Sequence, residues 1–446
     1  MSATESSVER EASSKRRAIP AFFFPLLSQE DAADPERIAE TLNTIDPAAV
    51  GRSDLLVYLH IPFCQDLCHF CGFYRRAAPR DRGLLDRYVD RLLAELAVWS
   101  RSGVLEHARV KAVYIGGGTP SLLPPELIGR LLRGLREHLP LAHEGVEFSF
   151  EGEARTLGDE SRLAVLRELG VTRVSFGVQS MDPEVRRLAG LGASLDDVRA
   201  CAEAVRGHDY AVCADLIFGL PGQTPEVFRR DLTAVVDELG ASLIDLYELI
   251  LYPNAAMFAE RARFRSLKPT DEERRAMYGM ALEALDAAGF LQWTLEDFCR
   301  PGHEYEMKHL VYGGDDGRAQ TLALGACAVG YLGGQAYRNQ IVERYLEVPR
   351  EQLPIATLHR AADDEIRRRP LFFYPRRLYL RPECVPGGLT AEQQGVLEAQ
   401  VEQGLVRRDA GDATLRLSPL GMTRADDMVR QFLTGAERRK LFKIVQ

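Results

Sequence analysis

The chain has 446 residues, of which 46% are hydrophobic and 27% are charged. These values are typical of a globular protein, and the length favours one large domain with appendages. The net charge of −9 argues against broad nucleic-acid binding, and no apolar run approaches the roughly 18 residues needed to span a membrane. The polar N-terminus lacks the apolar core of a secretory signal. We therefore expect neither nucleic-acid nor membrane partners. The sparse, unpaired cysteines indicate a reducing cytoplasm, and we expect a monomer.

The predicted elements, taken in chain order, place a strand–helix repeat between two different flanks. Residues 1–17 are rich in Ser, Glu and Lys and are predicted to be disordered. Residues 18–51 form an N-terminal extension, and residues 52–345 form the main domain. Its predicted strands are 54–60, 111–115, 146–152, 172–177, 211–218 and 243–249. Its predicted helices are 83–101, 124–138, 159–169, 195–207, 224–239 and 270–288.

This succession predicts an α/β fold, a partial (β/α)6 barrel of the TIM type with helices outside a parallel sheet. In such barrels the chemistry takes place at the carboxyl ends of the strands. Residues 346–446 are predicted to form a separate C-terminal lobe. It begins with an Arg-rich, irregular stretch at 350–377 and continues as helix, turn, short strand pair and final helix. That order is typical of a small helical, winged-helix-like lobe, which we expect to act as a lid on the barrel.

The most informative motif follows the first predicted strand. Cys64, Cys68 and Cys71 have the spacing C-x3-C-x2-C. Three thiolates so close together can hold three corners of a cubic iron–sulfur cluster, which leaves one iron open to a substrate. Two alternatives are a structural zinc site completed by His60 or His69 and a disulfide framework. The remaining cysteines stand apart in the sequence, and Cys213 is expected in the core: Cys201, Cys213, Cys299, Cys327 and Cys384.

Together with the preceding Tyr-x-His-Ile-Pro-Phe-Cys, this spacing resembles the radical S-adenosylmethionine (SAM) superfamily. The similar branch contains oxygen-independent coproporphyrinogen III oxidase, haem chaperones, anaerobic haem-opening enzymes and class C radical SAM methyltransferases. The resemblance covers about residues 52–340. It implies that Cys64, Cys68 and Cys71 hold a [4Fe–4S] cluster that cleaves SAM reductively to a 5′-deoxyadenosyl radical. It also implies a low-potential electron donor such as flavodoxin or ferredoxin.

The resemblance further implies which residues contact SAM. Three residues of GGGTP (116–120) would hold its amino group, and Glu151, at a strand end, would bind the ribose hydroxyls. Gln179 and Asp215 match positions of a second SAM site. The remaining nucleotide contacts fall at Tyr58, Phe70 and Val329, with another region near Ile250. The implied cofactor-binding set is therefore Tyr58, Phe70, Gly117, Gly118, Thr119, Glu151, Gln179, Asp215 and Val329.

Three departures from the family pattern bear on the substrate. Leu191 stands where relatives have an Arg for a ligand carboxylate, and Arg187, one helical turn earlier, could replace it. Phe73 follows the cluster motif at a position where coproporphyrinogen oxidases have another cysteine. His309 matches the haem-binding histidine of the chaperones, but Leu310 and Gly314 replace that motif's Asn and Trp.

These observations lead to a main prediction and two alternatives. The main prediction is methyl or methylene transfer to an sp2 carbon of a small molecule, giving methylation or cyclopropanation with a second SAM. The first alternative is an anaerobic tetrapyrrole enzyme, either a coproporphyrinogen oxidase or a haem-opening enzyme. The second alternative, from another class, is a haem chaperone.

Overall fold

The computed structural model describes residues 24–28, 31–141 and 145–444. The segment predicted to be disordered, 1–17, and residues 18–23 of the predicted extension lie outside the described residues. No helix of the described chain combines the length and apolarity needed to cross a lipid bilayer.

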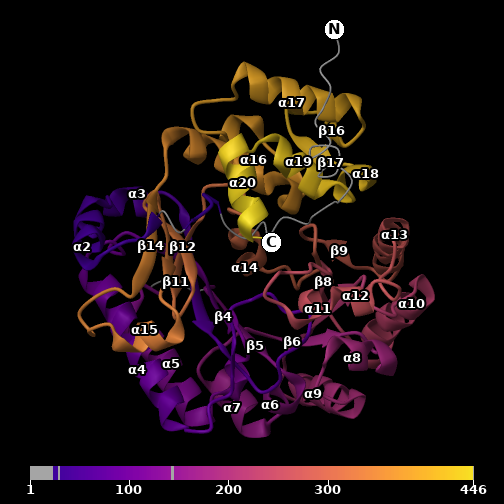
Figure 1. The fold of residues 1–446 in the computed structure, drawn as a ribbon, viewed down its shortest axis with the longest axis horizontal. Coiled ribbons are helices and arrows are strands. Elements are labelled where there is room, and N and C mark those ends of the chain that lie inside the picture. Colours follow the sequence, from indigo (N-terminus) through magenta and orange to yellow (C-terminus); the bar gives the residue numbers. More distant parts are fainter. Residues whose placement is uncertain (1–23, 29–30, 142–144, 445–446) are drawn as a thin grey trace.

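A curved parallel sheet forms the body of the molecule (Figure 1). Seven neighbouring strands run parallel, and helices cover their convex side. In spatial order they are β11 (Gln320–Leu324), β1 (Asp54–Ile61), β4 (Arg109–Gly117), β5 (Glu147–Gly152), β6 (Arg173–Gln179), β7 (Val212–Phe218) and β8 (Leu243–Glu248). Six of them lie at the six predicted strands. Because parallel strands end at one rim, their carboxyl ends bring distant motifs together.

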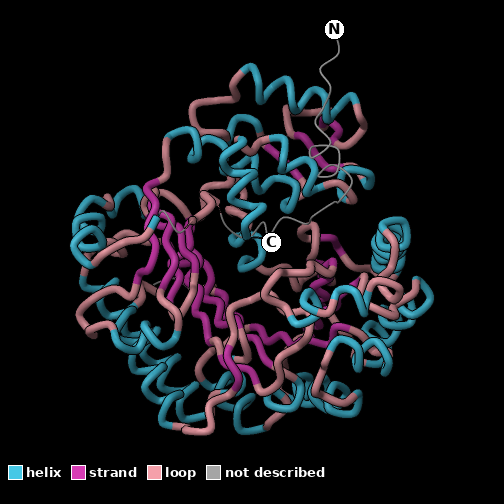
Figure 2. The backbone as a smooth tube through the Cα atoms, viewed as in Figure 1, coloured by secondary structure: helices cyan, strands magenta, loops and turns pink. Residues whose placement is uncertain are grey.

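Antiparallel strands extend both edges of this sheet, so that it contains 12 strands within the described residues. On the β8 side these are β10 (Asp297–Cys299) and β9 (Leu291–Gln292). On the β11 side they are β12 (Val329–Leu332), β13 (Gln335–Asn339) and β14 (Ile355–Arg360). The sheet therefore has two free edges and remains an open barrel, as the tube in Figure 2 shows.

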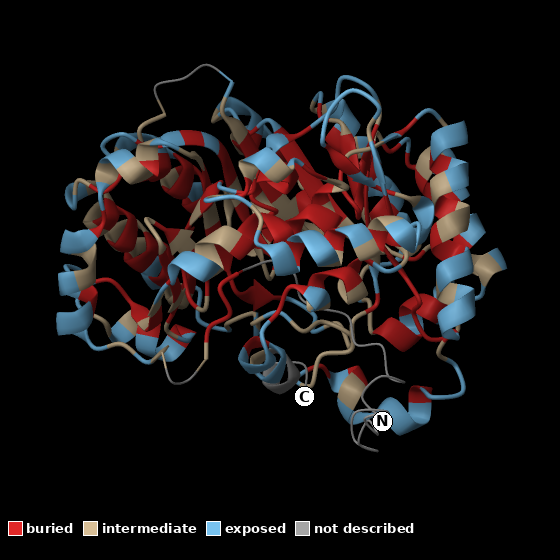
Figure 3. Cartoon of the chain, turned by 90° about the horizontal axis from the view of Figure 1, so that it is seen from above, coloured by how far each residue is buried: buried red, intermediate tan, exposed pale blue. Residues whose placement is uncertain are grey.

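The outer helices bury an apolar stripe against the sheet. In α4 the buried residues include Leu85, Val89, Leu92 and Leu96, which recur at the three- and four-residue spacing of one helical face. The outer helices are α4 (Gly83–Arg101), α5 (Pro125–His138), α7 (Glu160–Glu168), α9 (Leu195–Gly207), α10 (Pro225–Thr233) and α13 (Asp271–Ala287). The helix predicted at 224–239 changes to a π-turn, η3 (Ala234–Glu238), at its end. Figure 3 shows buried strands enclosed by helices with exposed outer faces.

The shorter elements connect this framework. Within the described residues two helices precede β1, and the other short elements lie in loops or at sheet edges. They are α2 (Pro35–Thr44), α3 (Pro47–Gly51), β2 (Phe63–Cys64), β3 (Arg76–Ala77), η2 (Pro120–Leu122), α6 (Ala154–Leu157), α8 (Pro183–Ala189), α11 (Ala256–Ala259), α12 (Arg261–Phe264), α14 (Glu306–Val311) and α15 (Val342–Glu347).

The C-terminal lobe lies on the open side of the barrel (Figure 1). It contains a three-stranded sheet, β15-β17-β16, and helices around its own hydrophobic core. Its elements are α16 (Asp363–Arg377), β15 (Tyr379–Leu380), η4 (Pro382–Cys384), α17 (Ala391–Glu402), β16 (Val406–Arg408), β17 (Leu415–Leu417), α18 (Pro419–Met422), α19 (Ala425–Gln431) and α20 (Gly435–Ile444).

The prediction of an irregular stretch at 350–377 is wrong, because β14 and α16 occupy most of it. Helix α16 also spans the gap between the two sides of the barrel. Arg376 forms a buried ion pair with Glu296, which precedes β10. Arg369 donates to the carbonyls of Gly317 and Ala319, which precede β11, at 3.1 and 2.8 Å. The lobe is thus attached to both flanks of the opening by buried charges.

Candidate active site

The cysteine loop leaves β1 and crosses the carboxyl rim of the barrel. The amide of His69, between the second and third cysteines, donates to the carbonyl of Ala189 at the end of α8 (2.9 Å). The amide of Met257 in α11 donates to the carbonyl of His69 (2.8 Å). Gly72 lies against the Tyr252 ring so closely that an added Cβ would come within 2.0 Å of it. The loop is therefore shaped by segments that follow β6 and β8.

All eight cysteines are described and are free thiols, which argues against a disulfide framework. Among the described residues, one trio of candidate ligands has all its ligand atoms within 4.8 Å of one another, and it does not include the loop cysteines. The three loop sulfurs are therefore spread more widely than 4.8 Å. A tetrahedral zinc ion with bonds of about 2.3 Å holds its sulfurs about 3.8 Å apart. A cubic cluster, in contrast, binds each thiolate through a different iron. The loop therefore fits a cluster better than zinc.

Hydrogen bonds engage both ring nitrogens of His60 and one ring nitrogen of His69, the two histidines proposed as zinc ligands. The Nδ1 of His60 lies 2.7 Å from the Tyr58 hydroxyl, and its Nε2 lies 2.9 Å from the Tyr74 carbonyl. The Nδ1 of His69 lies 3.1 Å from the carbonyl of Leu188. Burial lowers the pKa of His60 to about 4, so this imidazole is neutral. His60 thus fixes the Tyr58 side chain and the return of the loop.

The glycine-rich turn after β4 lies beside the cysteine loop. The amide of Gly118 donates to Ile61 (2.8 Å) and that of Thr119 to Phe63 (2.8 Å), on the segment that leads to Cys64. A Cβ on Gly118 would lie 2.8 Å from the Ile61 carbonyl. The Thr119 side chain lowers the pKa of the Cys64 thiol, against the larger effect of burial. Glycine is required here because two backbones touch.

Glu151, at the end of β5, faces this turn. Its Oε2 accepts a hydrogen bond of 3.0 Å from the amide of Gly117. Burial raises the pKa of Glu151 above the ordinary carboxyl value, although the Gly117 amide opposes the shift. The structure therefore brings Glu151 and the glycine turn together at one rim, as the sequence predicts for residues that hold one ligand.

Gln179, at the end of β6, has a strained backbone. Its φ is 65°, in the left-handed region that non-glycine residues rarely adopt, and the strand pairing shifts register there. Its buried Oε1 has no hydrogen-bond partner in the described structure. Such an acceptor is costly unless a ligand donates to it. On β7, burial and then the charge of Asp245 raise the pKa of Asp215 well above its usual range.

The other predicted contacts lie at the edges of this group. Phe70 packs against an apolar cluster that includes Leu191. Val329 begins β12 and pairs with Arg338. Ile250 follows β8 and is half-buried. These positions are on the carboxyl side of the sheet.

The proposed replacement of the missing arginine by Arg187 has no support in the geometry. Arg187 is exposed, and its guanidinium makes a two-point ion pair with Glu184 (2.6 and 2.7 Å). The buried neighbour is Arg186, which donates to the carbonyls of Val178 and Ser180 at 2.8 and 2.9 Å. Arg186 therefore fixes the turn that carries Gln179.

Deeper in the barrel lies a charged group that the sequence did not reveal. The Nζ of Lys308, on α14, is 2.9 Å from Asp245 and 3.3 Å from Asp297, and it donates to the Tyr247 hydroxyl. Arg173, on β6, lies 3.4 Å from Asp245. Helix α14 carries Lys308 inside the barrel because its Met307 and Leu310 pack on apolar residues of β1 and β4.

The charges of this group are strongly coupled. Burial alone would raise the pKa of Asp245, but Lys308 and Arg173 outweigh it and hold that pKa at about 2. Burial raises the pKa of Asp297 to about 7 despite Lys308. Burial alone would lower the pKa of Lys308, but the two aspartates raise it well above its ordinary value. Lys308 and Asp245 are therefore a charged pair at neutral pH.

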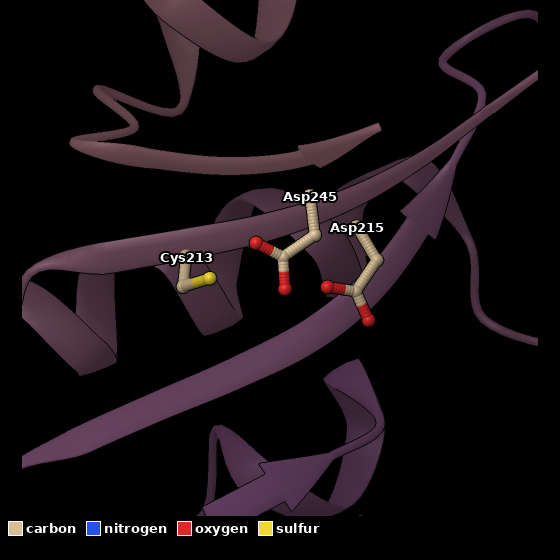
Figure 4. A group of neighbouring side chains, drawn as sticks. All are labelled: Cys213, Asp215 and Asp245. Carbon is tan, nitrogen blue, oxygen red and sulfur yellow. The ribbon is translucent and has the colours of Figure 1, made fainter. Parts of the chain in front are cut away.

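Cys213, Asp215 and Asp245 form the trio with ligand atoms within 4.8 Å (Figure 4). Two cations already occupy their surroundings: Arg173 donates to the Cys213 sulfur at 2.8 Å, and Lys308 pairs with Asp245. A metal ion there would be repelled by both. Cys213 lies in the core as predicted, in an apolar cluster with Leu243 and Cys299, and its sulfur also accepts from Arg173.

His309 lies between the barrel and the C-terminal lobe. Its Nε2 is 3.3 Å from the Tyr379 hydroxyl, its Nδ1 is 3.7 Å from Asp315, and its ring packs beside Trp293. The side chain is buried. A haem iron could reach His309 only if these contacts opened.

Comparisons with known proteins agree with this geometry. The family model of the radical SAM superfamily matches residues 58–235. Anaerobilin synthase of Escherichia coli O157:H7 is 32% identical over 306 residues, covering 68% of this chain and 67% of the relative. The heme chaperone HemW of Mycobacterium tuberculosis is 32% identical over 383 residues, 84% of this chain and 94% of the relative. The solved coproporphyrinogen III oxidase (HemN) of E. coli has a TM-score of 0.73 at 25% identity, covering 86% of this chain and 92% of that one.

An open α/β barrel with a three-cysteine loop at its carboxyl rim is the architecture of a radical SAM enzyme. The chain belongs to the radical SAM superfamily, in the branch of proteins similar to oxygen-independent coproporphyrinogen III oxidase. It is accordingly an enzyme of this chemistry, with a [4Fe–4S] cluster and SAM as cofactors. The predicted fold class and cofactors are confirmed. The comparisons support the tetrapyrrole alternative better than methyl or methylene transfer.

Proposed function

We propose that this enzyme modifies a tetrapyrrole anaerobically, by oxidation of a porphyrinogen or by opening of a haem ring. The main support is the extent of the structural similarity to HemN, which covers 86% of this chain and 92% of that one. Similarity to an anaerobilin synthase supports the same substrate class.

In this proposal each residue group has a separate task. Cys64, Cys68 and Cys71 hold the cluster, and the Thr119 hydroxyl supports the Cys64 sulfur. When bound, the cluster and SAM supply an electron to the sulfonium and a 5′-deoxyadenosyl radical. Glu151 holds the SAM ribose, because a carboxylate accepts from two neighbouring hydroxyls. The buried Oε1 of Gln179 accepts a donor of the second ligand.

Methyl or methylene transfer is a second candidate, and one observation favours it. Phe73, which is half exposed beside the cluster loop, stands at a position where coproporphyrinogen oxidases have a further cysteine. The strained Gln179 and Asp215, whose pKa burial raises, offer a polar site for a second SAM whose carbon could be transferred. This chemistry is compatible with a tetrapyrrole as the acceptor.

The haem-chaperone alternative is less well supported by the site. The buried contacts of His309 with Tyr379 and Trp293 make it a residue that joins the lobe to the barrel. We therefore expect His309→Ala to loosen the lobe without abolishing haem binding.

The experiment uses the reconstituted, anaerobic full chain with SAM and a reductant. Coproporphyrinogen III or haem is added, and 5′-deoxyadenosine and products are measured by mass spectrometry. We expect the tetrapyrrole to increase 5′-deoxyadenosine formation and to be consumed in the same reaction. Methyl-deuterated SAM then separates the candidates, because label in the product assigns carbon transfer, and label only in released methionine assigns oxidation or ring opening.

The variant with serine at Cys64, Cys68 and Cys71 is the control for the radical chemistry. The tetrapyrrole proposal is wrong if neither coproporphyrinogen III nor haem is altered and 5′-deoxyadenosine forms at the same rate with and without the tetrapyrrole. Stoichiometric haem binding with no SAM turnover would favour the chaperone.

A further inference from the structure

Arg75, four residues after the last cluster cysteine, folds back onto the cysteine loop. Its Nη2 donates to the Cys68 carbonyl at 3.2 Å, and its Nη1 donates to the Phe73 carbonyl at 3.3 Å. Its Nε is buried and has no hydrogen-bond partner in the described structure. The guanidinium is thus held beside the loop by two carbonyls only.

No carboxylate balances this charge. Within the described part of the chain, no Asp or Glu oxygen lies within 4.0 Å of the Arg75 guanidinium. The adjacent Arg76 pairs with Glu343, and Arg155, which also reaches the cysteine loop, pairs with Asp66 and Glu153. A half-buried guanidinium is ordinarily paired, because burying an isolated charge is costly.

The Arg75 guanidinium lies on the loop that would hold the cluster. The carbonyls to which it donates belong to Cys68, a predicted cluster ligand, and to Phe73, two residues after Cys71. A three-thiolate [4Fe–4S] centre has a net charge of about −1 when oxidised and about −2 after it gains one electron. Arg75 has no carboxylate partner among the described residues, and the negative charge of the bound cluster with its three thiolates would therefore balance the guanidinium.

We propose that Arg75 is the counter-charge of the cluster and favours its reduced state. The inference rests on the proposed cofactor chemistry, not on the choice of substrate. In the step concerned, a low-potential one-electron donor loses one electron and the cysteine-bound centre gains it, with no proton transfer. Arg75 is a positioning residue that acts through the centre. An opposite charge at close range favours the more negative state of its partner by about tenfold or more.

The test is a redox titration of the reconstituted full chain without SAM, followed by electron paramagnetic resonance. Three variants are compared with the wild type: Arg75→Gln, Arg75→Lys and Arg155→Gln. At a fixed potential, Arg75→Gln is expected to lower the ratio of reduced to oxidised centre at least tenfold, which is about 59 mV for one electron. Arg75→Lys retains the charge and is expected to keep the ratio of reduced to oxidised centre close to the wild-type value. Arg155→Gln is the matched control, because Asp66 and Glu153 already compensate its charge.

An unchanged midpoint in Arg75→Gln at full iron content overturns the inference. If this variant does not load iron, the thiols of the unloaded full chain are alkylated and the Cys68 peptide is followed by mass spectrometry. Slower alkylation of Cys68 at neutral pH, the result of losing the positive charge, supports the inference. Faster alkylation, the result of a loosened cysteine loop, refutes the inference. Absence of any [4Fe–4S] signal in the wild type would instead refute the proposed function.

Discussion

Replacement of Lys308 by methionine is the sharpest test of the charged group inside the barrel. Methionine retains much of the side-chain volume but removes the cation that pairs with Asp245 at 2.9 Å and with Asp297 at 3.3 Å. Asp245 keeps Arg173 at 3.4 Å and the Tyr305 hydroxyl at 2.5 Å. Asp297 loses its ion-pair partner and keeps the Thr294 hydroxyl, at 2.5 Å.

The expected cost follows from breaking a buried pair. Removing one partner leaves an uncompensated charge, which destabilises a protein by about 3–5 kcal/mol. The pKa of Asp297 is raised to about 7 in the native chain, against about 3.9 when unfolded. The native state therefore binds more protons, and stability falls as the pH rises from about 4 to about 7. Without Lys308 the native pKa rises further, so this fall continues above pH 7.

The difference in unfolding free energy between Lys308→Met and wild type should therefore grow by about 2 kcal/mol between pH 7 and 8.5, at about 1.4 kcal/mol per pH unit. Urea unfolding followed by tryptophan fluorescence measures it, because the Trp293 indole donates to the Tyr305 carbonyl beside α14 (2.8 Å). The exposed Lys111→Met is the control and should change stability by less than about 0.5 kcal/mol. A cost below about 1 kcal/mol, or one that shrinks as the pH rises, would refute the reasoning.

Three further predictions address the carboxyl rim of the barrel and the edge strand β14. Gln179→Gly should raise the unfolding free energy by about 1 kcal/mol, since it relieves a left-handed residue, yet calorimetry should show weaker SAM binding. Glu151→Gln should lower SAM affinity about tenfold or more through the loss of a charged acceptor, with no loss of thermal stability because burial opposes its charge. Hydrogen bonding to Glu365 raises the pKa of His359, so its contribution is complete below about pH 6.5 and is lost as the pH rises through the raised value. His359→Gln should therefore flatten the melting temperature measured from pH 6 to 8, and an unchanged slope would contradict this.

The elements that the sequence predicts best are those with local signals. β1 is an apolar run that leads directly into three cysteines, and α9 has an Asp–Ser capping arrangement, with Ser194 accepting from Asp197. Helix α16 was missed because Pro370 and Pro375 lie inside it and argue for a break. From Arg368 onward the helix is almost entirely buried, and this burial overrides the local preference.

The residues of the candidate site also divide into those with a local sequence signal and those without one. The cysteine loop and the glycine turn could be found because their residues are neighbours in the chain. Lys308 could not, because its partner Asp245 is 63 positions away and no motif surrounds it. One usable signal was the acidic residue in each of two apolar strand-like runs, Asp215 and Asp245, which are oddly placed for a buried sheet.

The way the cysteine loop is held has a consequence for biosynthesis. Its backbone hydrogen-bonds Ala189 and Met257, both of which leave the ribosome long after Cys71. The loop can adopt its final geometry only once more than half of the polypeptide has been translated and α11 has docked. Delivery of iron and sulfide during maturation should therefore target a nearly complete chain, and nascent fragments ending before α11 should fail to retain the metal.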